Sequence, residues 1–156
     1  MKRAQELIIA YGLQPHPEGG WFAEDYTCPW DMDGRPLAGS IFFLLDGEEV
    51  SHFHQIDCDE LWYYHEGCGL KITVLFQGEL RTMLLGRDPA AGERACVLLP
   101  AGAVFAAENL DKTGCTFLSC ATAPAFRYEG FRLISAEELE KLIPQEAAGL
   151  RRLAIK

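Results

Sequence analysis

The spacing of apolar positions changes along the chain, from a helical repeat at the start to strand-like runs over most of the length. The apolar residues at helical spacing are Ala4, Leu7, Ile8 and Tyr11. Gly12 follows them and is a typical C-terminal stop for a helix. The pattern therefore predicts one short N-terminal helix.

From position 21 to about position 123, short apolar runs alternate with turn residues. The expected strands are 21–27, 40–45, 51–55, 61–66, 70–76, 79–85, 95–99, 104–108 and 115–122. Asp33-Gly34 is a hairpin signal, and Gln77-Gly78 marks another turn. Many short strands without intervening helices predict an all-β sandwich or barrel and argue against a parallel α/β sheet.

The C-terminal segment returns to a helical pattern. Residues 135–138 read Ser-Ala-Glu-Glu, a capping box in which Ser135 and Glu138 satisfy each other's backbone donors. Apolar residues at 139, 142 and 143 follow, and Pro144 ends the helix. We see no linker or repeat, so the sequence predicts a single domain, 1–156, with a barrel core of about 20–123.

The composition of the chain bears on its binding partners, its cellular location and the state of its cysteines. The net charge is −9 and no run of Lys or Arg exceeds a pair, which argues against nucleic acid or an acidic membrane as partner. No apolar run approaches the roughly 20 residues of a membrane span, and no signal-peptide core is present, so we expect a cytoplasmic protein. The six cysteines are expected to be buried, reduced thiols rather than disulfides or zinc ligands, with Cys96, Cys115 and Cys120 in apolar strands.

The candidate chemistry lies at positions 52–64. Residues two apart on a strand share a face, so His52 and His54 are expected to project side by side. A hairpin would bring Glu60 back beside them, and the same parity would place Trp62 and Tyr64 on the Glu60 face. His65 has the opposite parity and is expected to point away. Two imidazoles, a carboxylate and aromatic walls favour a small-ligand pocket over purely structural histidines.

The arrangement of these residues is compatible with a metal cofactor and with none. Two histidines and one carboxylate suit iron, manganese, nickel or zinc with open coordination positions. The same residues also suit metal-free acid/base chemistry, in which His54 and Glu60 act as a pair and Tyr64 donates a proton. We therefore expect either one divalent metal, held by His52, His54 and Glu60, or no cofactor.

These residues resemble the first motif of the cupins, a glycine, His-x-His, a glutamate and a further glycine. The matching positions are Gly47, His52, His54, Glu60 and Gly67, with one extra residue between His54 and Glu60. The second cupin motif is matched at Pro100, Gly102 and Asn109, but Phe105 stands where that motif has its histidine.

Within the cupins, the chain resembles the cupin-5 family, a domain of unknown function. The shared stretches are His-Pro-Glu-Gly-Gly at 16–20, Ser-x-x-His at 51–54, Asp-Glu-x-Trp at 59–62, Pro-Ala-Gly at 100–102 and Ala-Pro-x-Phe at 123–126. Arg127 departs from the family, which has an aspartate there. The resemblance implies a double-stranded β-helix, or jelly-roll barrel, with short terminal helices, a pocket inside the barrel and a homodimer.

Three functions remain open at this stage. The first is binding of a sugar-like or nucleotide-sugar ligand, with epimerase or isomerase chemistry by His54 and Glu60. The second is a metal-dependent isomerase or oxygenase, and the third a metabolite-binding module without turnover. Candidate ligand contacts besides the pair are His52, Trp62 and Phe105. Glu18 at the pocket mouth is a further candidate, although a turn explains the glycines beside it equally well. Asn109 is another, but the sequence favours a loop cap for it.

Overall fold

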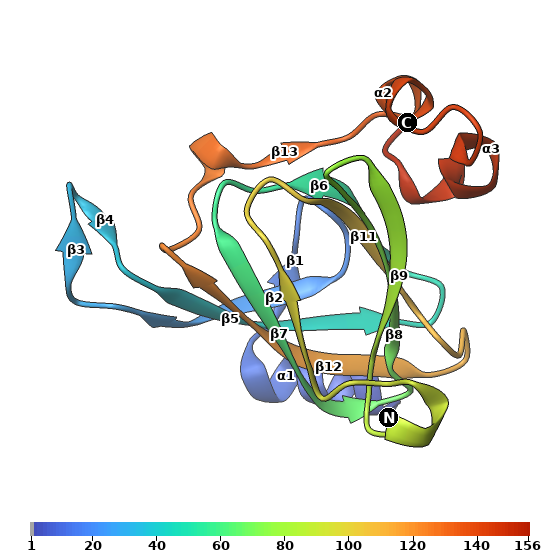
Figure 1. Ribbon diagram of the computed structural model, residues 1–156. Helices are drawn as coiled ribbons and strands as arrows, with labels where there is room; N and C mark the ends of the chain where they lie inside the picture. Colours follow the sequence, from blue (N-terminus) through green and yellow to red (C-terminus); the bar gives the residue numbers. More distant parts are fainter. Residues whose placement is uncertain (1) are drawn as a thin grey trace.

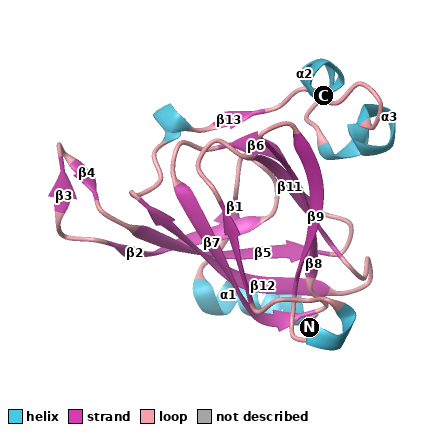
Figure 2. Ribbon diagram, viewed as in Figure 1, coloured by secondary structure: helices cyan, strands magenta, loops and turns pink. Residues whose placement is uncertain are grey.

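Two antiparallel sheets face each other and enclose the interior of the molecule (Figure 1). The computed structural model describes residues 2–156. The first sheet has six strands in the order β1-β2-β5-β12-β7-β10, and the second has five in the order β13-β6-β11-β8-β9. Strands dominate the chain, and helices occur near its two ends and in short turns between strands (Figure 2). This is the all-β barrel that the alternation of short strands and turns predicts.

The strand bounds follow the expected runs closely. The strands are β1 (Gln14–Pro15), β2 (Trp21–Thr27), β3 (Asp31–Met32), β4 (Arg35–Pro36), β5 (Gly39–Asp46), β6 (Val50–Gln55), β7 (Asp59–Gly67), β8 (Leu70–Phe76), β9 (Glu79–Leu85), β10 (Cys96–Leu99), β11 (Val104–Asn109), β12 (Cys115–Ala123) and β13 (Arg132–Leu133). The helices are α1 (Arg3–Tyr11), α2 (Ala136–Leu142) and α3 (Ala147–Leu150), with short 3-10 turns η1 (Pro89–Ala91), η2 (Tyr128–Gly130) and η3 (Arg151–Leu153).

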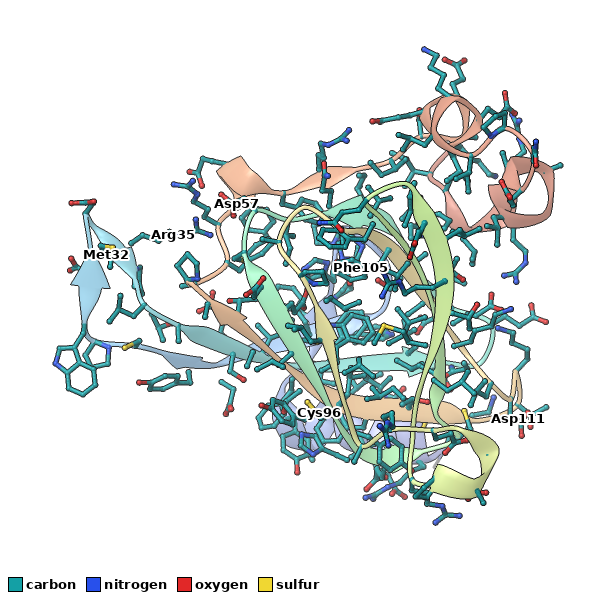
Figure 3. The ribbon with its side chains drawn as sticks, viewed as in Figure 1. Met32, Arg35, Asp57, Cys96, Phe105 and Asp111 are labelled. Atoms are coloured by element: carbon teal, nitrogen blue, oxygen red, sulfur yellow. The ribbon has the colours of Figure 1, made fainter. Side chains whose placement is uncertain are left out.

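The main core lies between the two sheets. Its largest side chains include Phe43, Trp62 and Phe105, each at most 1% exposed. Phe105 lies in the middle of the barrel interior (Figure 3). A second apolar cluster on the outer face of the five-stranded sheet joins Phe53 of β6 to Leu139 of α2. The strand β6 is therefore packed on both faces, and this double burial fixes which of its side chains reach the interior.

The terminal helices cover outer faces of the barrel. Helix α1 packs Ala4 and Leu7 against Leu44 and Phe117 on the outside of the six-stranded sheet, and Gly12 ends it in the left-handed conformation, as predicted. Helix α2 begins at Ser135, whose hydroxyl accepts the backbone N–H of Glu138. The predicted capping box forms only by half, because the Glu138 carboxylate pairs with Arg132 instead of returning to Ser135.

A hairpin projects from one side of the barrel. Strands β3 and β4 pair through Asp33 and Gly34, which both have positive φ, as the hairpin signal predicts. Met32 lies on this projecting hairpin (Figure 3), and Trp30 and Met32 are 71% and 68% exposed. The homodimer implied by the family resemblance stays a prediction.

The cysteines follow the expectation of buried, reduced thiols only in part. The six cysteines are free thiols, and Cys28, Cys58 and Cys120 are buried. Cys96 is exposed, contrary to expectation, because it lies on β10 at the edge of the six-stranded sheet with its side chain facing outward.

Among residues 2–156, no helix combines the length and the apolar character needed to cross a bilayer.

Candidate functional site

A cavity of about 280 Å³ opens at one end of the barrel interior. Its walls come from strands β2, β4, β5, β6, β7 and β12, from the loop before β2, from the β6–β7 connection and from the segment after β12. The lining residues are His16, Glu18, Phe22, Glu24, Tyr26, Thr27, Pro36, Gly39, Ser40, Ile41, His54, Ile56, Glu60, Cys120, Thr122, Ala125, Phe126 and Tyr128. The volume is near the lower end of the roughly 300–1,000 Å³ of small-molecule sites, which suits a ligand of about one ring.

A β-bulge in β6 decides which side chains of the Ser-His-Phe-His stretch face the cavity. Ser51 is paired with Ala107 and His54 with Phe105, so that His52 and Phe53 together oppose the single residue between them. Ser51 and His54 consequently both point inward. The expectation that His52 and His54 project side by side is wrong, because regular alternation is interrupted at this bulge.

His52 lies outside the cavity and holds the loop that carries Glu18. Its backbone N–H, freed from the strand ladder by the bulge, donates to the carbonyl oxygen of Glu18 over 2.8 Å. Its ring Nδ1 lies 2.8 Å from the same oxygen and must also donate, since a carbonyl only accepts. His52 therefore positions Glu18 in the cavity wall instead of contacting a ligand there.

Glu60 reaches the cavity from the other sheet. Strand β7, which begins at Asp59, pairs with β12 and β10, whereas β6 pairs with β11 and β13. The predicted hairpin between His54 and Glu60 is therefore wrong, because residues 56–58 cross from one sheet to the other. His54 and Glu60 nevertheless line the same cavity, since the inner faces of both sheets meet there.

The loop between β1 and β2 places Glu18 beside His54. Glu18 is 7% exposed, and its Oε1 accepts a hydrogen bond of 2.8 Å from the Ser51 hydroxyl. Its Oε2 lies 3.2 Å from His54 Nε2 and 3.7 Å from His16 Nδ1. Because His16 Nδ1 accepts the backbone N–H of Glu18, that nitrogen carries no proton in this arrangement. The close partner of the Glu18 carboxyl is thus His54.

Gly19 allows this loop to pack directly on β6. It has φ +104°, and a Cβ atom there would lie 2.1 Å from the Val50 carbonyl oxygen. We expect Gly19→Ala to lower the free energy of unfolding by at least about 3 kcal/mol, because left-handed strain and a backbone clash combine. Gly78→Ala is the matched control, since its φ is +78° and no atom lies within 4 Å of the added carbon. It should cost only about 1–2 kcal/mol.

Urea denaturation of the two variants measures the difference. Equal losses for Gly19→Ala and Gly78→Ala would show that the loop does not depend on close contact with β6.

The buried Glu18–His54 pair holds a shared proton. His54 Nδ1 lies 2.7 Å from the carbonyl oxygen of His52, so Nδ1 is the protonated nitrogen of the neutral ring. Its Nε2 then presents a lone pair to Glu18 Oε2, and only a proton between them makes that contact favourable. Burial raises the pKa of Glu18 and lowers the pKa of His54, so the neutral pair is favoured, with the Glu18 hydroxyl donating to Nε2.

The pKa of the Glu60 carboxyl is raised to about 7. Burial is the main cause; ionisation of Glu18 adds to it, and a positive charge on His54 would oppose it. Glu60 is 8% exposed and forms no ion pair with any other residue of the described chain. The indole N–H of Trp62 and the thiol of Cys120 lie beside Glu60 and lower its pKa slightly, and the indole N–H has no other hydrogen-bond partner within residues 2–156. Near neutral pH this carboxyl can therefore both accept and release a proton.

The remaining predicted residues do not belong to the cavity wall. Trp62 and Phe105 are buried, and Phe105 packs edge-on against the His54 ring with 4.2 Å between ring centroids. The Tyr64 hydroxyl donates to the Gly67 carbonyl, away from the cavity lining. The Asn109 amide donates to the carbonyl oxygens of Leu45 and Gly47, so this residue caps a loop. His65 points away, as expected, and contacts the Ser119 hydroxyl.

Several cavity residues were absent from the predicted site. Phe22, Glu24 and Tyr26 come from alternate positions of β2, and Cys120 and Thr122 from alternate positions of β12. Their period of two was visible in the sequence, but it does not say which of the two strand faces is inward. His16 belongs to the His-Pro-Glu-Gly-Gly stretch and was not separated there from the turn residues.

The predicted metal ligands do not converge. His52 points away from the cavity, and an aromatic ring occupies position 105. Over residues 2–156, no group of three His, Cys, Asp or Glu side chains is arranged to hold a metal ion. The donor set therefore does not fit the three-ligand site expected from the sequence, and no chemical step is assigned to a metal here.

The double-sheet barrel with a cavity at one end of its interior is the cupin fold. Oxalate decarboxylase from B. subtilis, in a variant form, superposes with a TM-score of 0.58 at 16% identity over 89% of this chain and 36% of that one, which shows the fold alone. Residues 5–134 match the family model described as Cupin superfamily (DUF985). The chain belongs to this family, Cupin_5, as its sequence motifs predict.

Uncharacterised relatives share nearly the whole chain. Protein SO0799 from Shewanella oneidensis is 38% identical, with a TM-score of 0.94 over 99% of both chains. A hypothetical protein from Leishmania major is 28% identical, with a TM-score of 0.91 over 98% of this chain and 99% of that one. The uncharacterized protein YML079W of Saccharomyces cerevisiae is 27% identical over 96% of this chain and 85% of its own length.

Proposed function

We propose that this cupin binds a small polar ligand of about one-ring size and moves a proton on it, as an epimerase or isomerase does. The observation that carries the proposal is the pair of proton-holding groups, Glu18–His54 and Glu60, in one cavity. Buried titratable groups with shifted pKa values are typical of sites that transfer protons.

The chemistry follows from where each proton is held. Glu60, when ionised, removes the proton from a carbon next to a ligand carbonyl. The Glu18–His54 pair gives its shared proton to the carbonyl oxygen, so that a neutral enol forms and Glu18 is left as a carboxylate. Ser51, which donates to Glu18, stabilises that carboxylate. Return of both protons, with the carbon proton added to the other face or the other carbon, gives an epimer or an isomer.

A sugar-like ligand suits this cavity better than a nucleotide sugar. No lysine or arginine belongs to the lining formed by the described residues, so a diphosphate has no cation to meet inside. Arg35 and Arg127 lie nearby on the outside, and both bind the Asp57 carboxylate. Arg127, the departure from the family pattern, thus ties the segment after β12 to the β6–β7 turn.

Solvent exchange tests the proposal. The protein is incubated in D₂O with aldoses, ketoses and their deoxy and amino derivatives, and proton NMR follows loss of the signal next to the carbonyl. We expect protein-dependent exchange in at least one compound, and its loss in Glu60→Gln. Glu79→Gln, at a side chain that is 77% exposed, is the control and should exchange normally.

Two outcomes would count against proton transfer. No exchange in any compound would remove the catalytic part of the proposal. A compound that raises the melting temperature and is recovered unchanged, with no deuterium, would favour the metabolite-binding module instead.

A further inference from the structure

The charges that line the cavity are unbalanced. Three carboxyl groups, those of Glu18, Glu24 and Glu60, belong to the lining. The only titratable nitrogens in the lining formed by residues 2–156 are those of the His16 and His54 imidazoles. Burial lowers the pKa of both rings. Among residues 2–156, no permanently positive side chain contributes to the walls. An anion entering this cavity would meet three carboxyl groups and no permanent cation.

Glu60 is the strongest sign of a missing partner. Carboxylates are almost never buried to this degree without a cation or several donors. Glu60 is only 8% exposed and lines the cavity. It forms no ion pair in the described part of the chain, and the donors beside it, the Trp62 indole and the Cys120 thiol, are both neutral. Since a carboxylate can only accept, the group that completes it must bring N–H or O–H donors, and a positive charge would offset burial best.

Aromatic side chains occupy the wall beside these carboxyl groups. Phe22, Tyr26, Phe126 and Tyr128 all contribute to the lining. Phe126 and Tyr128 pack edge to face with 5.0 Å between centroids, so their position is mutually fixed. Aromatic faces attract organic cations and gain more from them when the site is shielded from water. Carboxylates combined with aromatic rings are the chemistry that recognises an ammonium group.

We propose that the ligand of this cavity is a small organic cation, a protonated primary amine on a ring or polyol, whose ammonium group lies beside Glu60. This inference rests on the proposed function and names its substrate class, for which an amino sugar is the simplest example. The ammonium group keeps Glu60 ionised, which is the form that removes a proton from carbon. An amine on the carbon next to the carbonyl brings that C–H to the same carboxylate.

The test uses three rings of similar size and different charge. Cyclohexylamine, cyclohexanol and cyclohexanecarboxylate are positive, neutral and negative at pH 7 and have nearly the same size. Isothermal titration of the full chain should give at least about tenfold tighter binding for the amine than for the alcohol. The carboxylate should bind at least tenfold more weakly than the alcohol.

A variant assigns the charge preference to one residue. Glu60→Gln should weaken the amine at least tenfold and leave the alcohol within about twofold. Glu79→Gln should change neither, because Glu79 is exposed on β9, far from the lining residues. The comparison of the three rings on the unaltered chain does not depend on how well the variant folds.

Three results overturn the inference: a carboxylate that binds as tightly as the amine, an amine that does not bind, or an amine whose affinity is unchanged in Glu60→Gln. The solvent-exchange experiment tests proton transfer independently of these binding results. Exchange into neutral sugars without amine preference leaves the proposed function intact, and amine binding without any exchange supports the cation site while removing the catalysis.

Discussion

Replacing His54 by glutamine should lower the rate of proton exchange by about 10²–10⁴-fold, the usual contribution of a general acid or base. Glutamine can still accept a hydrogen bond from the Glu18 hydroxyl, but it has no titratable nitrogen, so residue 54 can no longer share the proton of Glu18. His54 is 2% exposed and its Nε2 lies 3.2 Å from Glu18 Oε2, which makes it the exchanging partner of that carboxyl.

The control for this variant is His65→Gln. His65 lies on the outer face of β7, where its ring contacts the Ser119 hydroxyl. Its replacement should leave exchange within about twofold of the unaltered protein, far below the change expected from a general acid or base. Exchange rates from NMR, measured at saturating substrate, compare the two variants directly. If His54→Gln and His65→Gln exchange equally fast, the Glu18–His54 pair is not the proton donor.

Replacing Glu60 by glutamine should stabilise the protein at pH 8 and leave it nearly unchanged at pH 4. The pKa of Glu60 rises from 4.5 to about 7 on folding. Between these values the unfolded chain ionises Glu60 while the folded chain does not, so stability falls as pH rises through this window. Above pH 7 the loss is complete and amounts to about 3 kcal/mol, at 1.36 kcal/mol per pKa unit.

Calorimetry at the two pH values measures this effect. A gain of about 3 kcal/mol corresponds to roughly 6–12 °C in melting temperature for a chain of this size. Glu79→Gln removes an exposed carboxylate and should shift the melting temperature little at either pH. A Glu60→Gln variant that is no more stable than the unaltered protein at pH 8 would show that the cavity solvates the ionised carboxylate well.

Much of the fold follows from local pattern. Strands β2, β8 and β9 begin and end where the sequence predicts, because alternation and turn residues act over a few positions. The left-handed Gly12 and the positive φ of Asp33 likewise follow from residue type. These features depend on each segment's own chemistry, and the family resemblance adds the order in which the strands are arranged.

The site was predictable only in part. His54, Glu60 and Glu18 were expected in the cavity and do line it. The orientation of His52 depends on a bulge opposite β11, and the separation of β6 from β7 depends on which strands each one pairs with. Neither the orientation of His52 nor the separation of the two strands can be predicted from residue spacing, because both arise from contacts between segments far apart in the chain.

The bulge in β6 also matters for how such barrels change over evolution. With His52 and Phe53 opposite one residue, the inward positions of this strand are 51 and 54, which hold a serine and a histidine. A one-residue insertion or deletion here changes which side chains the cavity receives while both sheets keep their pairing. A His-x-His match in a relative therefore does not identify two ligands until the strand register is known. A small genetic step in one strand is enough to exchange one chemistry for another in the same barrel.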